Sequence, residues 1–120
     1  SEWASTGSLV GLGGVTVEGA LISLFSDNNC TLPSYVSFKS DFQKDFGVSP
    51  AFDAVNAYDA ANVVMDSLAA RRKGESLKET VLRLATFQGV QGPITLDPYG
   101  DANRKAYIAK VSNATIMVLE

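Results

Sequence analysis

The central part of the sequence restricts the fold most, because apolar residues recur there with helical spacing in three successive segments. The first segment lies between Pro33 and Gly47, residue types that are typical of the first turn and the end of a helix. Its aromatic residues, at steps of three and four, are Tyr35, Phe38, Phe42 and Phe46. We therefore predict an amphipathic helix whose aromatic stripe packs in the core. The alternative is a ring of aromatic side chains around a ligand.

The second helical segment opens at Pro50 and reaches the basic run at residues 71–73. That run complements the negative end of a helix dipole, which favours a helix terminus over a binding patch. The predicted apolar face consists of Ala51, Val55, Tyr58, Ala61 or Asn62, Met65, Leu68 and Ala69. This face leaves Asp53 and Asp59 to solvent.

The third helical segment has a clear start. Ser76 and Glu79 have the spacing of a capping box, in which each side chain bonds the other residue's backbone amide. We predict a helix from there to about Phe87, with Leu77, Val81 and Leu84 on its apolar face.

Short strand segments flank these helices. The run Ala20–Phe25 is nearly continuous in apolar residues, which favours a strand buried on both faces. After the helices, residues 94–96 predict a short strand, and residues 106–111 and 115–119 predict a C-terminal hairpin. A short helix of one or two turns fits residues 5–14. The fold class is α/β, with a strand, three main helices, a short strand and a hairpin.

Composition excludes several function classes. The 120 residues carry a net charge of −3 without a basic block, which does not favour nucleic acid as a partner. The chain has no His, and its single cysteine, Cys30, completes neither a zinc site nor an internal disulfide. Cys30 is either a small buried residue or the partner of a cysteine elsewhere. Zinc enzymes and Ser-His-Asp hydrolases are excluded if the chain acts alone.

No catalytic residue, metal or cofactor is predicted. Asp41 and Asp45, like Asp53 and Asp59, lie on predicted solvent faces, whereas an acid-base pair needs burial and convergence. The glycines at 11–14 lack the third glycine of a dinucleotide loop. The acidic residues at 97 and 101 lack the ligand ladder of a calcium loop and predict a turn.

Five short motifs, in this order and spacing, resemble one known pattern. They are Glu18-Gly19-Ala20, residues 42–47 with Pro50, Ala57-Tyr58-Asp59-Ala60, residues 87–92, and Leu96-Asp97 with Gly100-Asp101. The chain resembles the C-terminal third of type I periplasmic substrate-binding proteins, in particular the leucine/isoleucine/valine-binding family of ABC transporter receptors. The resemblance covers nearly all of the chain. One departure is Asn113-Ala114, where the family usually has Asn-Gly, which leaves the tightness of the final hairpin turn open.

The resemblance implies part of a two-lobed fold that closes on a small ligand, with neither lobe complete. The chain would be a single segment, with residues 1–31 and 92–120 in the second lobe and the helices of 32–91 in the first. The implied ligand contacts are Glu2, Trp3 and either Phe52 or Asp53. The Glu2 carboxylate would face an ammonium group, with Trp3 lining the cleft. The alternatives are a solvated terminal residue for Glu2 and core packing for Phe52.

The implied function is the capture of an amino acid or related small carboxylate for an ABC uptake transporter, without catalysis. Its partners would be the small-molecule ligand and a membrane permease, in the periplasm or outside the cell, with or without a lipid anchor on the parent. The alternatives are the sensor domain of a receptor, and an interaction module that uses the helix Tyr35–Phe46. Because the predicted elements leave sheet edges uncovered, we expect the isolated piece to self-associate, to exchange elements, or to be one part of a cleaved receptor.

Overall fold

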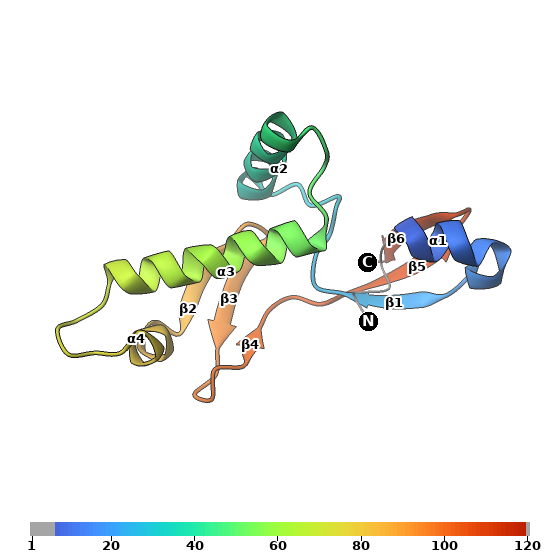
Figure 1. Ribbon diagram of the computed structural model, residues 1–120. Coiled ribbons are helices and arrows are strands. Elements are labelled where there is room, and N and C mark those ends of the chain that lie inside the picture. Colours follow the sequence, from blue (N-terminus) through green and yellow to red (C-terminus); the bar gives the residue numbers. More distant parts are fainter. Residues whose placement is uncertain (1–6, 120) are drawn as a thin grey trace. The chain divides into compact units, whose positions relative to one another are not determined.

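The computed structural model describes residues 7–119, which form two compact units (Figure 1). Unit 1 consists of residues Ser1–Asn28 and Lys105–Glu120, and unit 2 consists of Asn29–Arg104. The chain thus passes from one unit to the other twice, at residues 28/29 and 104/105.

Unit 1 contains an antiparallel sheet of three strands in the order β1-β5-β6. The strands are β1 (Leu21–Leu24), β5 (Tyr107–Ser112) and β6 (Thr115–Leu119). The core side chains of this sheet are Ile22, Leu24, Ala109 and Val111. The preceding helices, α1 (Gly7–Gly13) and the 3-10 helix η2 (Gly14–Val17), contribute Leu9, Val10 and Val17 to the same cluster.

β1 is buried on one face only, so the prediction of a strand buried on both faces is wrong. Ile22 and Leu24 are buried, whereas Leu21, the first residue of the strand, is 67% exposed. The reason is the antiparallel pairing of β1 with β5, which places alternate side chains on the two faces while α1 and η2 pack against one of them.

The C-terminal hairpin is tight despite its missing glycine. Ser112 pairs with Thr115, so only Asn113 and Ala114 form the turn, with φ angles of 52° and 57°. Positive φ at both positions is the hairpin geometry that matches the twist of the strands. The missing glycine, which left the tightness of the turn open, therefore does not loosen it, and Ala114 adopts a conformation that suits glycine better.

Unit 2 holds the three main helices and a second antiparallel sheet, in the order β2-β3-β4. The helices are α2 (Pro33–Phe46), α3 (Phe52–Ala69) and α4 (Leu77–Leu84). The strands are β2 (Thr86–Gly89), β3 (Gly92–Leu96) and β4 (Ala102–Asn103). The predicted ends of α2 are confirmed, since Pro33 opens it and Gly47 ends it with φ at 73°. The capping box of Ser76 and Glu79 is also formed.

The third helix is shorter than predicted. α4 ends at Leu84, because Ala85 turns into the left-handed region with φ at 56° and its amide closes the last turn on Val81. Residues 86–89 then pair with β3 instead of continuing the helix. Phe87 is consequently a buried strand residue.

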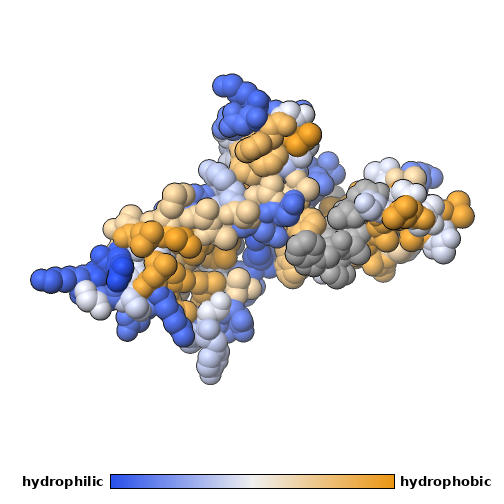
Figure 2. Space-filling view, in the orientation of Figure 1, coloured by the Kyte–Doolittle hydropathy of each residue, from blue (hydrophilic) through white to orange (hydrophobic). Residues whose placement is uncertain are grey.

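The aromatic stripe of α2 is only partly in the core. Tyr35 is buried, while Phe46 at the end of the helix is 66% exposed. The rings contact one another, with centroids 5.8 Å apart for Phe38 and Phe42, and Phe38 lies 4.7 Å from the Tyr58 ring of α3. Figure 2 shows hydrophobic surface over α2 and along the end of α3 that leads to α4.

The buried face of α3 differs from the predicted one. Its fully buried residues are Val55, Asp59 and Ser67, whereas Met65 and Leu68 are 57% and 52% exposed. Asp59 was expected in solvent and is instead 2% exposed. The ion pair described below explains this burial.

The compact units do not change at the expected lobe boundary of residue 92. β3 pairs with β2, and β4 with β3, so both strands belong with the helices and the chain returns to unit 1 only after Arg104. The assignment of the units to two lobes stays a prediction.

Candidate functional site

The start of α3 carries the two predicted ligand contacts that lie within residues 7–119. Ala51 is extended, Phe52 is the first helical residue, and Asp53 follows in the first turn. The Asp53 carboxylate is exposed and accepts a hydrogen bond of 2.9 Å from the Ala54 amide. A negative charge here is favoured by the positive end of the helix dipole. Phe52 is half-buried at the same end.

Asp59 lies farther along α3 and is the centre of a polar cluster. Its Oδ1 accepts a hydrogen bond of 2.9 Å from the Val90 amide, and its Oδ2 pairs with Nη2 of Arg104 at 2.9 Å. Nη1 of Arg104 donates to Oδ1 of Asn56 at 2.9 Å. Because both carboxylate oxygens have donors, the charge is compensated, as a buried charge requires.

The turn between β2 and β3 joins this cluster to α2. Ser34 Oγ donates to the Val90 carbonyl at 2.8 Å, so Val90 is held by α2 through its carbonyl and by α3 through its amide. The Val90 side chain packs with Tyr35 and Val55, and Cys30 packs against the same cluster. The segment that enters unit 2 is thereby attached to the base of α3.

A hollow of about 330 Å³ lies between α2, α3 and the end of β2. Its lining is of mixed polarity and consists of Ser34, Ser37, Phe38, Asp41, Tyr58, Asn62, Gln88, Gly89 and Val90. It includes neither Phe52 nor Asp53. Within residues 7–119, no group of three or more His, Cys, Asp or Glu side chains is placed to hold a metal ion.

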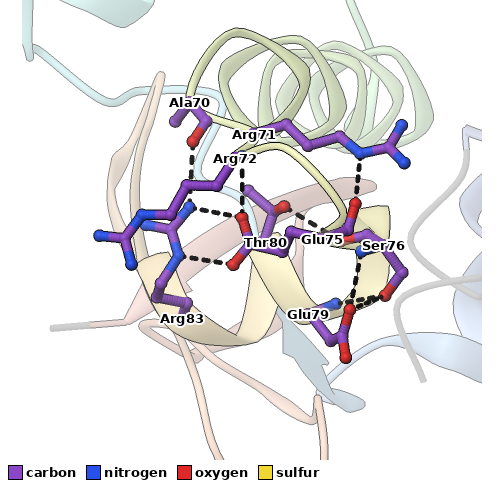
Figure 3. A network of polar contacts seen from close by, with 8 residues as sticks. All are labelled: Ala70, Arg71, Arg72, Glu75, Ser76, Glu79, Thr80 and Arg83. Atoms are coloured by element: carbon purple, nitrogen blue, oxygen red, sulfur yellow. Dashed lines mark hydrogen bonds and ion pairs between the residues drawn. The ribbon is translucent and has the colours of Figure 1, made fainter.

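A second polar network links the end of α3, the connection that follows it and α4 (Figure 3). Glu75 accepts hydrogen bonds from Nε and Nη2 of Arg83 at 2.7 and 2.9 Å and from the Arg72 amide at 3.1 Å. Arg83 also donates to the Ala70 carbonyl at 3.0 Å. The Arg83 hydrogen bond and then the Arg72 amide lower the pKa of Glu75 from an ordinary 4.5 to about 2. The contacts are within one connection, which indicates a structural role.

The structure thus brings together only part of the predicted site. Glu2 and Trp3 lie outside the described residues. Phe52 and Asp53 share the start of α3, and whether they contact a ligand stays a prediction. Sequence reasoning missed Asn56 and Arg104, which hold that end of the helix to the segment leaving unit 2.

The chain was compared with known protein families, curated proteins and solved structures. No family model and no curated protein matches the chain. Among solved structures, a leucine-binding protein from Thermotoga maritima superposes with a TM-score of 0.80 at 24% identity, over 98% of this chain and 34% of that one. The chain has part of the type I periplasmic substrate-binding protein fold. This confirms the predicted fold.

Two further structures with the periplasmic binding fold carry bound solutes. An ABC transporter substrate-binding protein from Desulfitobacterium hafniense, in complex with Leu, has a TM-score of 0.74 at 21% identity, over 88% of this chain and 32% of that one. A solute-binding protein from R. palustris, in complex with benzoate, has a TM-score of 0.70 at 18% identity, over 92% and 32%. The chain therefore spans about one third of the length of these proteins. Across residues 7–119, no helix is both long and apolar enough to cross a membrane.

Proposed function

We propose that the protein containing this chain is the solute-binding component of an ABC uptake system and captures an amino acid or related small carboxylate between two lobes. The observation that carries this proposal is the superposition on a leucine-binding protein over 98% of the chain. The proposal includes a membrane permease as partner, a periplasmic or extracellular location, and no catalysis.

The solutes named for similar structures support a ligand with a carboxylate. One similar protein is complexed with Leu, another with benzoate and a third with 3,4-dihydroxybenzoic acid. These molecules differ in their apolar parts and share a carboxylate group. Closure of two lobes would remove water around such a charge and strengthen each hydrogen bond to it.

The proposed contacts are Glu2, Trp3 and Phe52 or Asp53, together with residues of the remaining two thirds of the fold. A carboxylate at Glu2 facing the ammonium of an amino acid would contribute about 1.5–3 kcal/mol through a charge-assisted hydrogen bond. That corresponds to a loss of about 10- to 150-fold in affinity for Glu2→Gln. Benzoate has no ammonium, so its affinity is expected to change much less.

The experiment is a thermal-shift and calorimetric screen of the chain together with the rest of its fold. Leucine, valine and benzoate are compared with leucinol and benzyl alcohol, which lack the carboxylate. A true solute at 100 times its dissociation constant adds about 2.7 kcal/mol of stability. Phe52→Ala is expected to weaken binding, while the control Phe46→Ala, which truncates an aromatic residue that is 66% exposed, is not.

The absence of a shift with every carboxylate would refute the proposal. Equal shifts with the acids and the alcohols would refute the ligand class alone. A sensor domain with the same fold would bind the same solutes, and a membrane segment following it in the gene would distinguish sensing from transport. Self-association of the isolated chain also stays a prediction, and a monomeric mass in light scattering would contradict it.

A further inference from the structure

The segment that leaves unit 2 is held by that unit up to its last residue. β4 pairs with β3, and Thr95 Oγ1 donates to the Asn103 carbonyl at 3.2 Å. Arg104 follows, and its guanidinium group bonds both Asn56 and Asp59 on α3. Arg104 is half-buried, with 18% of its side chain exposed, and Asp59 is almost fully buried.

The next residue belongs to the other unit. Lys105 is the first residue of the returning part of unit 1, and its Nζ lies 4.7 Å from the centre of the Tyr107 ring on β5. The side-chain attachment to unit 2 therefore ends at Arg104, directly before the boundary between the units. Rotation about the backbone between Arg104 and Lys105 would leave the bonds of Arg104 intact.

The incoming segment is attached near the same part of α3. Cys30, two residues after the first crossing, packs against the cluster of Tyr35, Val55 and Val90. Asp59 accepts a hydrogen bond from the Val90 amide and also pairs with Arg104. One carboxylate therefore contacts Arg104, at the second crossing, and Val90, which packs near Cys30 at the first. Asn56 and Asp59 lie one turn apart, within the first three turns of α3.

We propose that Asp59 and Arg104 are positioning residues that fix the pivot between the two units and so set the balance between open and closed forms. The inference rests on the proposed function for its effect on solute affinity. Without the bonds of Arg104, the chain is held by unit 2 only as far as Asn103 in β4. The flexible segment between the units becomes longer, and the units can adopt a wider range of orientations. A wider range in the free protein lowers the fraction that is ready to close.

The test compares two arginine truncations of the same kind. Arg104→Met removes the pivot anchor, whereas Arg83→Met removes an arginine that also pairs with a carboxylate in unit 2, Glu75, but touches neither crossing. Spin labels at Met65→Cys on α3 and Lys110→Cys on β5, in a Cys30→Ala background, report the distance between the units. The protein is the full chain with the rest of its fold.

We expect Arg104→Met to broaden the distribution of label distances and to weaken solute binding by about 2- to 30-fold, the range typical of residues that act at a distance. Arg83→Met is expected to change neither. Arg104→Lys, which keeps the charge beside Asp59 but loses the fork to Asn56, should give an intermediate width. If Arg104→Met does not fold, Asn56→Ala tests the same anchor, since it leaves Asp59 paired.

A distance distribution for Arg104→Met or Asn56→Ala that coincides with the wild type would overturn the inference. Equal broadening in Arg83→Met would overturn it as well, because general loosening of unit 2 would then be the cause. The distance measurement needs no solute, so it tests the pivot independently of binding. Failure of the wild type to bind any carboxylate would reject the proposed function, while the label distances would still confirm or reject the role of Arg104.

Discussion

The turn at Asn113 and Ala114 permits a sharp prediction, because its second residue is held in an unfavourable conformation. Ala114 has a φ angle of 57° and is exposed. The substitution Ala114→Gly removes the clash between Cβ and the backbone in the left-handed region without removing a buried contact. We expect the variant to be more stable than the wild type.

The magnitude is the difference of two opposing effects. The left-handed conformation costs an L-residue about 1–2 kcal/mol relative to the right-handed one. Glycine recovers that cost but has about 0.4–1 kcal/mol more conformational freedom to lose on folding. The midpoints of these two ranges leave a net stabilisation of about 0.8 kcal/mol, which raises the melting temperature of a domain of this size by about 2–6 °C.

The assay is thermal unfolding followed by circular dichroism, with Gly47→Ala as the reciprocal control. Gly47 ends α2 with φ at 73°, and a Cβ added there would have no atom within 4 Å. The effect of that substitution is therefore purely conformational, and it should lower the melting temperature by a similar amount. Shifts of the two variants in the same direction would refute the reasoning.

The remaining predictions concern Glu75 and Gly89. Because the pKa of Glu75 is lowered to about 2, its contribution is complete above pH 4.5 and is lost as the pH falls toward 2. Denaturant titrations of wild type and Glu75→Gln should thus differ at neutral pH and converge in acid, and a constant difference would contradict this. A Cβ at Gly89 would lie 2.8 Å from Asp59 Oδ2 and 2.9 Å from the Gly92 carbonyl, so Gly89→Ala should destabilise by about 1–3 kcal/mol. The control is Gly11→Ala in α1, where a Cβ would meet nothing within 4 Å, and this variant should be neutral or stabilising. Equal changes of the melting temperature in Gly89→Ala and Gly11→Ala would show that the predicted clash at Gly89 does not occur.

The helix boundaries were predictable where short-range chemistry determines them. Pro33 and Gly47 bound α2, and the reciprocal bonds of Ser76 and Glu79 start α4, because each signal acts within one turn. The end of α4 was not predictable in the same way. Ala85 takes a left-handed conformation that glycine usually supplies, so residues 86–89 looked like a continuation of the helix.

The polar core of unit 2 could not be predicted from the helical periodicity, because it depends on contacts between residues far apart in the sequence. Asp59 is buried because Arg104, 45 residues later, and the Val90 amide compensate its charge. An aspartate flanked by Val55 and Asn62 on one helical face was the available signal, but its partner could not be inferred from spacing. Of the predicted ligand contacts, Phe52 and Asp53 share one helix end, and Glu2 and Trp3 remain predictions.

The pairing of β1 with β5 has a consequence for the order of folding. Unit 2 is continuous in sequence, so all of its strands and helices can meet before the rest of the chain is made. β1 is synthesised before unit 2, so its pairing with β5 waits until all of unit 2 has emerged, a delay on the order of ten seconds at typical rates of translation. Unpaired strand edges are open to wrong pairing in that interval, and the sheet of unit 1 is complete only after β5 and β6 have followed unit 2.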